Sequence, residues 1–224
     1  MPASPASPAS PAKPRMHSAE DDLAFRRSIV EGGGRPTLTL AICYLAGGLL
    51  YGLQCLFHVG QILGLIRWPE PANLAFVVAI SAAFMAILVW AIRKDRRDEA
   101  AGQRGPLATR ALNAGLSGAG MANAAIIIVF GVGAARDQDF GVWLYYPAMI
   151  FALQSAAWYM AWNLKKKGWM LATALGGWAT AVALGLLVRQ PDWYLGVCTV
   201  ALFALFALPG WIMFRDARGG SKAG

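Results

Sequence analysis

Long apolar runs alternate with short polar connections along most of the chain. The first run, from Thr37 to Ile66, contains thirty residues, and His58 is its only acidic or basic side chain. A helix rises about 1.5 Å per residue, so this run is longer than the roughly 30 Å hydrocarbon core of a bilayer. Five further runs of twenty or more residues lack acidic and basic side chains altogether. The pattern predicts an all-α integral membrane protein, a bundle of six transmembrane helices at about 37–66, 73–92, 111–134, 141–162, 169–188 and 194–214.

The first run carries its polar side chains in a seam. Residues spaced by three and four lie on the same face of a helix, and in this run they are Tyr44, Gly47, Tyr51, Gln54, His58 and Gln61. A polar face is costly in contact with lipid tails, so this face is predicted to point into protein. The first span is therefore the expected hub of the bundle.

Three other predicted spans carry a polar or aromatic residue near the same depth as Gln54. Counting 1.5 Å per residue from the end of each span places four side chains within about 5 Å of the midplane, namely Gln54, Asn123, Gln154 and Trp178. His58 and Gln61 lie farther out. Two interpretations stay open: hydrogen bonds between helices that fix their packing, or a cavity that binds a solute.

The segment before the first span has a different composition. Residues 1–17 begin with three PAS repeats and lack an apolar core, which predicts a disordered leader and not a signal peptide. Residues 18–36 are predicted to form a short cytoplasmic helix and a glycine linker, with Ser18 as N-cap and Gly32 near the end. A modest apolar face favours a position on the membrane surface, while a helical stub without contacts and a docking site for a cytoplasmic partner are the alternatives.

Basic residues are distributed unevenly between the two ends of the predicted spans. The N-terminal segment, the second connection, the fourth connection and the tail hold 5, 6, 3 and 3 Lys and Arg residues, whereas the other three connections hold one each. Because basic residues close to spans are retained in the cytoplasm, both termini, including the tail 215–224, are predicted to be cytoplasmic. Topology and anionic lipid headgroups thus explain the net charge of +8, and no nucleic-acid partner is predicted.

No combination of residues indicates catalysis, a metal or a cofactor. The acidic and basic residues lie outside the predicted spans, which argues against a proton pump or an ion-coupled carrier. Cys43, Cys55 and Cys198 lie in apolar runs without metal-ligand or paired spacing. Gly115 to Gly118 resembles the GxSx motif of rhomboid-type intramembrane proteases, but that family needs a later histidine and none follows His58. The chain is therefore not expected to be an enzyme.

Small residues and prolines predict details of helix packing. Glycines at short spacing allow close approach of backbones, which is expected at Gly48, Gly52, Gly60, Gly64, Gly115, Gly118 and Gly120. Pro147 and Pro209 are expected to bend the fourth and sixth spans. Such contacts are expected within one chain or between two copies.

Two functions from different classes remain. The favoured one is a non-catalytic scaffold or regulator of the cell membrane that contacts lipid and binds a cytoplasmic protein or a second copy of itself. The alternative is a small-solute transporter or channel with a polar and aromatic site near the midplane, formed by Tyr51, Gln54, His58, Gln61, Asn123, Gln154 and Trp178.

Overall fold

Helices make up nearly all of the computed structural model, which describes residues 38–100, 107–138 and 140–219. No strand occurs within these ranges, so the prediction of an all-helical chain is confirmed for them. The leader and the surface helix predicted for residues 1–36 lie outside the described residues. In chain order the elements are α2 (Leu38–Ile62), α3 (Glu70–Ala100), α4 (Leu107–Asp137), the short α5 (Phe140–Trp143), α6 (Tyr146–Lys165), α7 (Gly168–Leu187), α8 (Pro191–Leu202), the π-helix η1 (Phe203–Ala207) and α9 (Leu208–Gly219).

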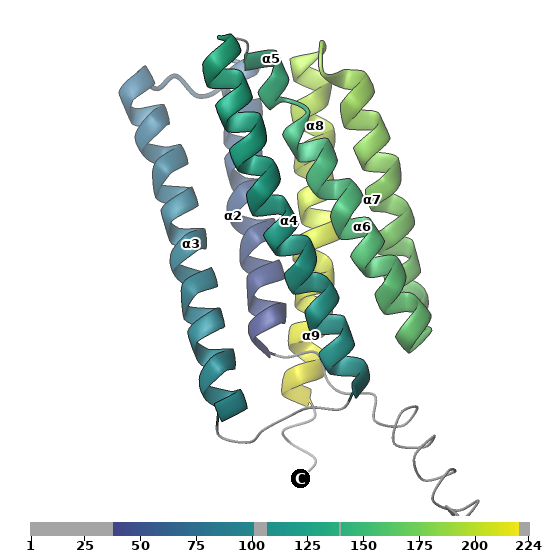
Figure 1. Cartoon of the computed structure of the whole chain (residues 1–224). Helices are drawn as coiled ribbons and strands as arrows, with labels where there is room; N and C mark the ends of the chain where they lie inside the picture. Colours follow the sequence, from purple (N-terminus) through teal and green to yellow (C-terminus); the bar gives the residue numbers. More distant parts are fainter. Residues whose placement is uncertain (1–37, 101–106, 139, 220–224) are drawn as a thin grey trace, which may run out of the picture.

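Five of the helical segments described are long and apolar enough to cross a membrane. They are Leu38–Ile62, Glu70–Arg97, Asn113–Asp137, Gly168–Leu187 and Pro191–Arg218. Helix α6 is not among them, since its twenty residues include Gln154, Ser155, Asn163 and Lys165. It nevertheless runs alongside α4 and α7 and contacts both (Figure 1). The predicted count of six spans is therefore supported for five helices.

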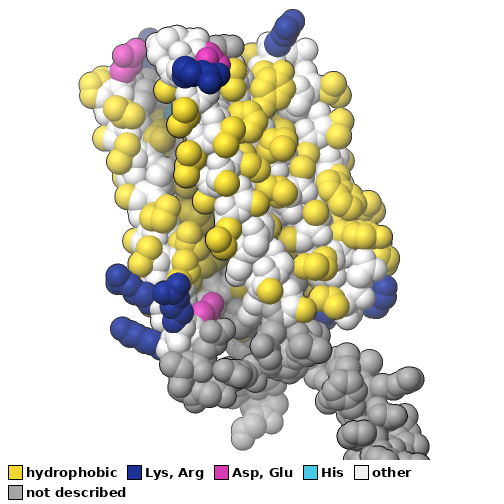
Figure 2. Space-filling view, in the orientation of Figure 1, with side chains coloured by type: hydrophobic (Ala, Val, Ile, Leu, Met, Phe, Trp, Pro, Cys, Tyr) yellow, Lys and Arg dark blue, Asp and Glu magenta, His cyan; other side chains and the backbone are white. Residues whose placement is uncertain are grey.

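Helix α2 and the α8–η1–α9 segment lie side by side in the bundle. Helix α3 packs against α2, while α6 packs against α4 on one side and α7 on the other. Figure 1 shows that α2 begins and α9 ends at the same end of the bundle. Apolar side chains cover the wall visible in Figure 2, and charged side chains gather near its two ends. This distribution is typical of a protein embedded in a bilayer.

Glycines explain how closely α2 approaches η1 and α9. A Cβ atom added at Gly48 would lie 2.2 Å from the backbone nitrogen of Ala207, and one added at Gly210 would lie 2.4 Å from that of Leu45. Only glycine fits at such a crossing. By contrast, Gly118 and Gly120 on α4 have open space where a Cβ atom would be.

The two prolines affect the chain in different ways. Pro209 has no N–H group, and the preceding turn is a π-helix in which the Leu208 N–H bonds the Phe203 carbonyl, five residues back. Pro147 does not bend the middle of a span, because it lies in the first turn of α6. The predicted span 141–162 is instead interrupted at Leu144 and Tyr145, between α5 and α6.

Helix ends also differ from the predicted ranges. Helix α2 stops at Ile62, and Gly64, with φ of 71°, lies in the turn that follows. Helix α3 continues to Ala100, so the first residues of the basic connection are helical and do not form a loop. One cause is visible in the packing: the Thr39 hydroxyl donates to Oδ1 of Asp95 at 2.5 Å and holds this extension against α2.

Candidate functional site

Gln154 lies at the centre of the bundle and has a specific partner on another helix. Its side chain is 8% exposed, and its Oε1 atom accepts a hydrogen bond from the hydroxyl of Tyr44. Tyr44 belongs to α2 and Gln154 to α6, so this bond links two helices that come from distant parts of the sequence. The bond satisfies polar groups that lipid tails could not satisfy.

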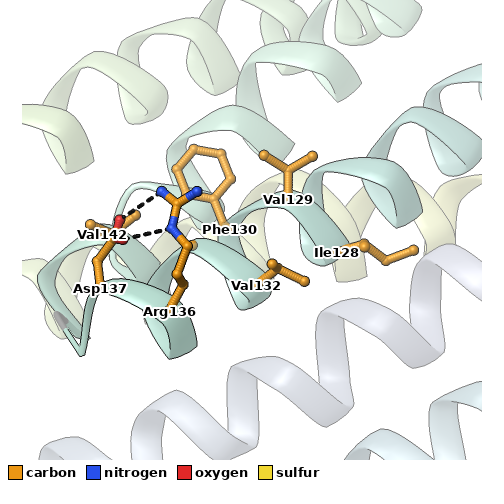
Figure 3. Close-up of a pocket in the computed structure, with 8 residues that line it drawn as sticks. Ile128, Val129, Phe130, Val132, Arg136, Asp137 and Val142 are labelled. Atoms are coloured by element: carbon orange, nitrogen blue, oxygen red, sulfur yellow. Dashed lines mark hydrogen bonds and ion pairs between the residues drawn. The ribbon is translucent and has the colours of Figure 1, made fainter.

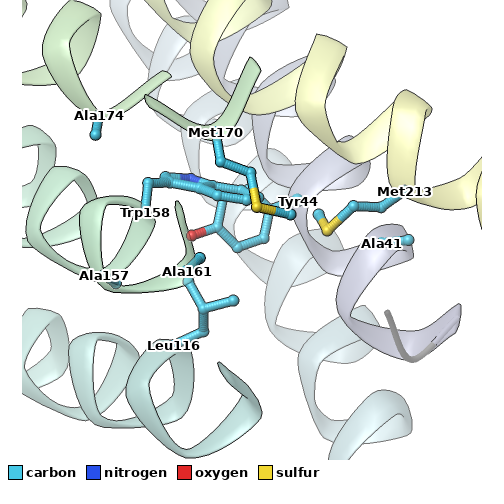
Figure 4. Close-up of a cluster of buried hydrophobic side chains, with 9 residues drawn as sticks. All are labelled: Ala41, Tyr44, Leu116, Ala157, Trp158, Ala161, Met170, Ala174 and Met213. Carbon is cyan, nitrogen blue, oxygen red and sulfur yellow. The ribbon is translucent and has the colours of Figure 1, made fainter. Parts of the chain in front are cut away.

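Aromatic rings surround this bond on several sides. The Tyr44 ring meets the Trp158 ring edge to face, with centroids 5.3 Å apart, and stacks on Phe206 at 5.5 Å. Figure 4 shows Tyr44 and Trp158 together, with Met170 of α7 beside them. Five helices contribute to the cluster drawn there, which contains Ala41, Tyr44, Leu116, Ala157, Trp158, Ala161, Met170, Ala174 and Met213. The polar centre is therefore close-packed with large apolar side chains.

A second polar group lies near the other end of α2. The Nδ1 atom of His58 is 2.9 Å from Oε1 of Gln61, and Nε2 of Gln61 donates to Oδ1 of Asn73 at 2.7 Å. Since an amide oxygen only accepts, His58 carries its proton on Nδ1 in this arrangement. The three residues form a chain that joins α2 to α3.

Two residues of the predicted polar site each have a buried oxygen atom without a hydrogen-bond partner in the described structure. These atoms are Oε1 of Gln54 on α2 and Oδ1 of Asn123 on α4. Oδ1 of Asn113 and Nε1 of Trp158 share this property. A buried polar atom without a hydrogen bond is costly, so each of these atoms has capacity for a further partner.

The two aromatic residues of the predicted site lie apart from Gln154. Tyr51 packs edge to face against Phe84 of α3, with centroids 5.3 Å apart. Trp178 on α7 is 36% exposed and lies beside Tyr159, at 5.6 Å. The seven residues of the predicted site thus fall into separate groups. Gln154 bonds Tyr44, His58 bonds Gln61, Gln54 and Asn123 each have an oxygen atom without a partner, and the rings of Tyr51 and Trp178 pack elsewhere.

Buried hydroxyl groups in α6, α7 and α8 are engaged within their own helices. Each donates to the backbone carbonyl four residues earlier, at 2.6 to 2.9 Å, in Ser155, Thr173, Thr180 and Thr199. This local bond satisfies the hydroxyl without a second helix. The donor hydrogens of these side chains are therefore used within their own helices.

Two hollows lie on the surface of the described structure. One, of about 520 Å³, lies between α4 and α5, where Arg136 and Asp137 form an exposed ion pair at 2.7 Å (Figure 3). A larger one, of about 890 Å³, lies along the outer face of α3. Neither contains Gln54, Asn123 or Gln154. Among the described residues, no three His, Cys, Asp or Glu side chains come together in a way that could hold a metal ion.

Sequence reasoning did not identify the partners of the polar residues. Asn73 was placed at the start of a span and Tyr44 in the seam, but neither was assigned a role. Likewise, Cys55 of α2 packs against the apolar cluster that contains Cys198 of α8, although their sequence spacing gives no sign that they are neighbours. Pairing of this kind depends on how each helix is rotated, which apolar sequence leaves open.

No protein-family model matches the chain, and no curated protein or solved structure shows significant similarity to it.

Proposed function

We propose that the protein is a six-span membrane protein with both termini in the cytoplasm, which acts as a non-catalytic scaffold or regulator. The observation that carries this proposal is the contact between Tyr44 and Gln154 inside a close-packed aromatic cluster. A polar residue that forms its bond within the core fixes the mutual rotation of α2 and α6. Its use of Oε1 within the core favours a packing role over the binding of a solute.

The distribution of charge supports the proposed orientation. Basic residues lie at the C-terminal ends of α3, α6 and α9, including Arg97, Lys166 and Arg218. These ends lie at the end of the bundle where α2 begins (Figure 1). Arg67, Arg136 and Arg189 are the basic residues at the opposite end, within the described ranges. The more basic end is placed in the cytoplasm.

The scaffold proposal is tested by removing the segment that would reach a cytoplasmic protein. The full chain and a variant lacking residues 18–31 are cross-linked in native membranes, and the attached proteins are identified. We expect one or more partners that attach to the full chain to be lost from the variant. A deletion of residues 2–12 controls for shortening of the N-terminal segment. An unchanged set of partners after deletion of 18–31 contradicts the proposal.

A second function, passage of a small neutral solute, has one observation in its favour. The unpartnered oxygens of Gln54 and Asn123 are acceptors that a solute hydroxyl or amide group could satisfy. Reconstituted liposomes are screened for swelling in a series of small polyols and amides. Uptake that falls in both Gln54→Leu and Asn123→Leu supports this function. Swelling equal to that of protein-free liposomes excludes it for those solutes.

A further inference from the structure

The outer face of α3 carries a groove that no part of the described chain covers. Its apolar part is lined by the small side chains of Ala82 and Ala86 and by the larger side chains of Met85 and Val89. The residues of α3 that pack against α2 lie on the opposite side of the helix, and include Phe84 and Ala91. The groove therefore faces the lipid that surrounds the bundle.

The groove changes character along its length. From Ala82 to Val89 its lining is apolar, and Met85 and Val89 are 55% and 39% exposed. Below, it ends at Trp90, Arg93 and Arg97, at the end of the bundle where basic side chains gather (Figure 2). Tryptophan and arginine in this order mark the level at which acyl chains give way to headgroups.

The repeat of the helix brings the two parts into line. Met85, Val89, Arg93 and Arg97 are spaced by four residues, so they form one continuous row on the helix surface. From Ala82 to Arg93 the helix rises about 16 Å, which is close to half of the roughly 30 Å hydrocarbon core. An acyl chain of one leaflet thus matches the length of the apolar part.

Arg93 and Arg97 are two of the three cations that line the lower end of the groove, beside Lys94. Neither Arg93 nor Arg97 forms an ion pair with a described residue. The nearby carboxylate of Asp95 points to the other side of α3, where it accepts the hydrogen bond of Thr39. Two guanidinium groups one helical turn apart can bind a phosphate group together.

From these observations we propose that the groove is a binding site for an anionic phospholipid of the leaflet at this end of the bundle. One acyl chain lies over Ala82 and Ala86, and the phosphate group is bound by Arg93 and Arg97. A second copy of the chain is disfavoured, because a symmetric pairing of parallel α3 helices would bring the same arginines together. The proposal does not depend on whether the protein acts as a scaffold or a transporter.

The test measures lipid binding to the purified full chain by native mass spectrometry. Phosphatidylglycerol is compared with phosphatidylcholine of identical acyl chains, and we expect the anionic lipid to bind more tightly. The charge variant R93Q/R97Q should weaken binding of phosphatidylglycerol about thirtyfold, from about 1 kcal/mol per basic residue near a membrane surface. The matched control R215Q/R218Q removes equal charge from α9 at the same end and should leave the affinity within about threefold.

A second variant tests the apolar part separately. Ala86→Trp adds a large side chain in the apolar part of the groove and keeps both arginines, so it should also weaken phosphatidylglycerol binding. Ala124→Trp adds the same bulk to an exposed position of α4 and should leave the affinity for phosphatidylglycerol unchanged. Equal binding of the two lipids, or equal effects of R93Q/R97Q and R215Q/R218Q, overturns the proposal. So does an unchanged affinity in Ala86→Trp, which would leave only general attraction between charges.

Discussion

At the scale of single residues, the polar side chains of the bundle differ in what they bind. Gln154 bonds Tyr44 within the core, Gln61 bonds His58 and Asn73, and Gln54 has an oxygen without a partner. The depth of these residues follows from counting along each span. Their partners do not, because a partner depends on how neighbouring helices are rotated and on where each helix begins.

The bond between Tyr44 and Gln154 should be measurable as a coupling free energy. Hydrogen bonds between membrane helices contribute about 0.6 kcal/mol on average and up to about 1.7 kcal/mol, and we expect about 1 kcal/mol for this buried pair. The measurement is a double-mutant cycle of Tyr44→Phe and Gln154→Leu, read as free energy of unfolding in mixed micelles. Tyr44→Phe paired with Thr180→Val serves as control, since Thr180 bonds its own helix. Strict additivity of Tyr44→Phe and Gln154→Leu contradicts the role assigned to this bond.

At the scale of helices, glycine spacing indicates where backbones can approach but not where they do. Gly48 and Gly118 look alike in the sequence, yet Gly48 meets the backbone of η1 at Ala207 and Gly118 faces open space. We therefore expect Gly48→Ala to destabilise the fold by about 1–3 kcal/mol through overpacking. Gly118→Ala should be neutral or stabilising by up to about 1 kcal/mol, because alanine favours helix. Equal unfolding free energies for the two variants would refute the close approach of α2 to η1.

The position of α8 against α2 makes an independent prediction. Cys55 and Cys198 are neighbours, so copper phenanthroline with oxygen should join them in a disulfide within one chain. Peptide mapping after alkylation identifies the linked pair. Cys55→Ala keeps Cys43 and Cys198 and should form no such link. If both thiols of the natural chain stay open to alkylation after oxidation, the two helices are not arranged as described.

Hydropathy predicts the ends of some helices closely and those of others poorly. The fifth predicted span, 169–188, differs from α7 by one residue at each end, because charged residues flank a uniformly apolar run. The ends of α3 were not predictable in this way, since Glu70 and Asp95 are helical although they are charged. Helix α6 is the opposite case: its burial between α4 and α7 allows polar residues that hydropathy counts against a span.

At the scale of the whole molecule, the proposed topology assigns each connection between spans to one side of the membrane. The test is decisive for α6, because Gln138 and Lys167 lie on opposite sides only if α6 crosses. A chain without its natural cysteines receives Gln138→Cys or Lys167→Cys and is labelled in intact cells with a maleimide that does not cross membranes. We expect labelling at position 138 without permeabilisation, and at position 167 only after it. Labelling of both positions in intact cells rules out the six-span arrangement.

The polar middle of the bundle is proposed to serve packing and to exclude water. Ala157 lies in the core cluster, one turn from Gln154, and its replacement by cysteine adds little volume. Reaction of Ala157→Cys with a small, membrane-permeant methanethiosulfonate is compared with reaction of Gln190→Cys, at an exposed position of the α7–α8 connection, in the cysteine-free chain. Because the reaction needs a thiolate, which requires water, we predict a rate at position 157 at least about a hundredfold lower than at position 190. Comparable rates would reveal a wet path through the bundle and contradict the account.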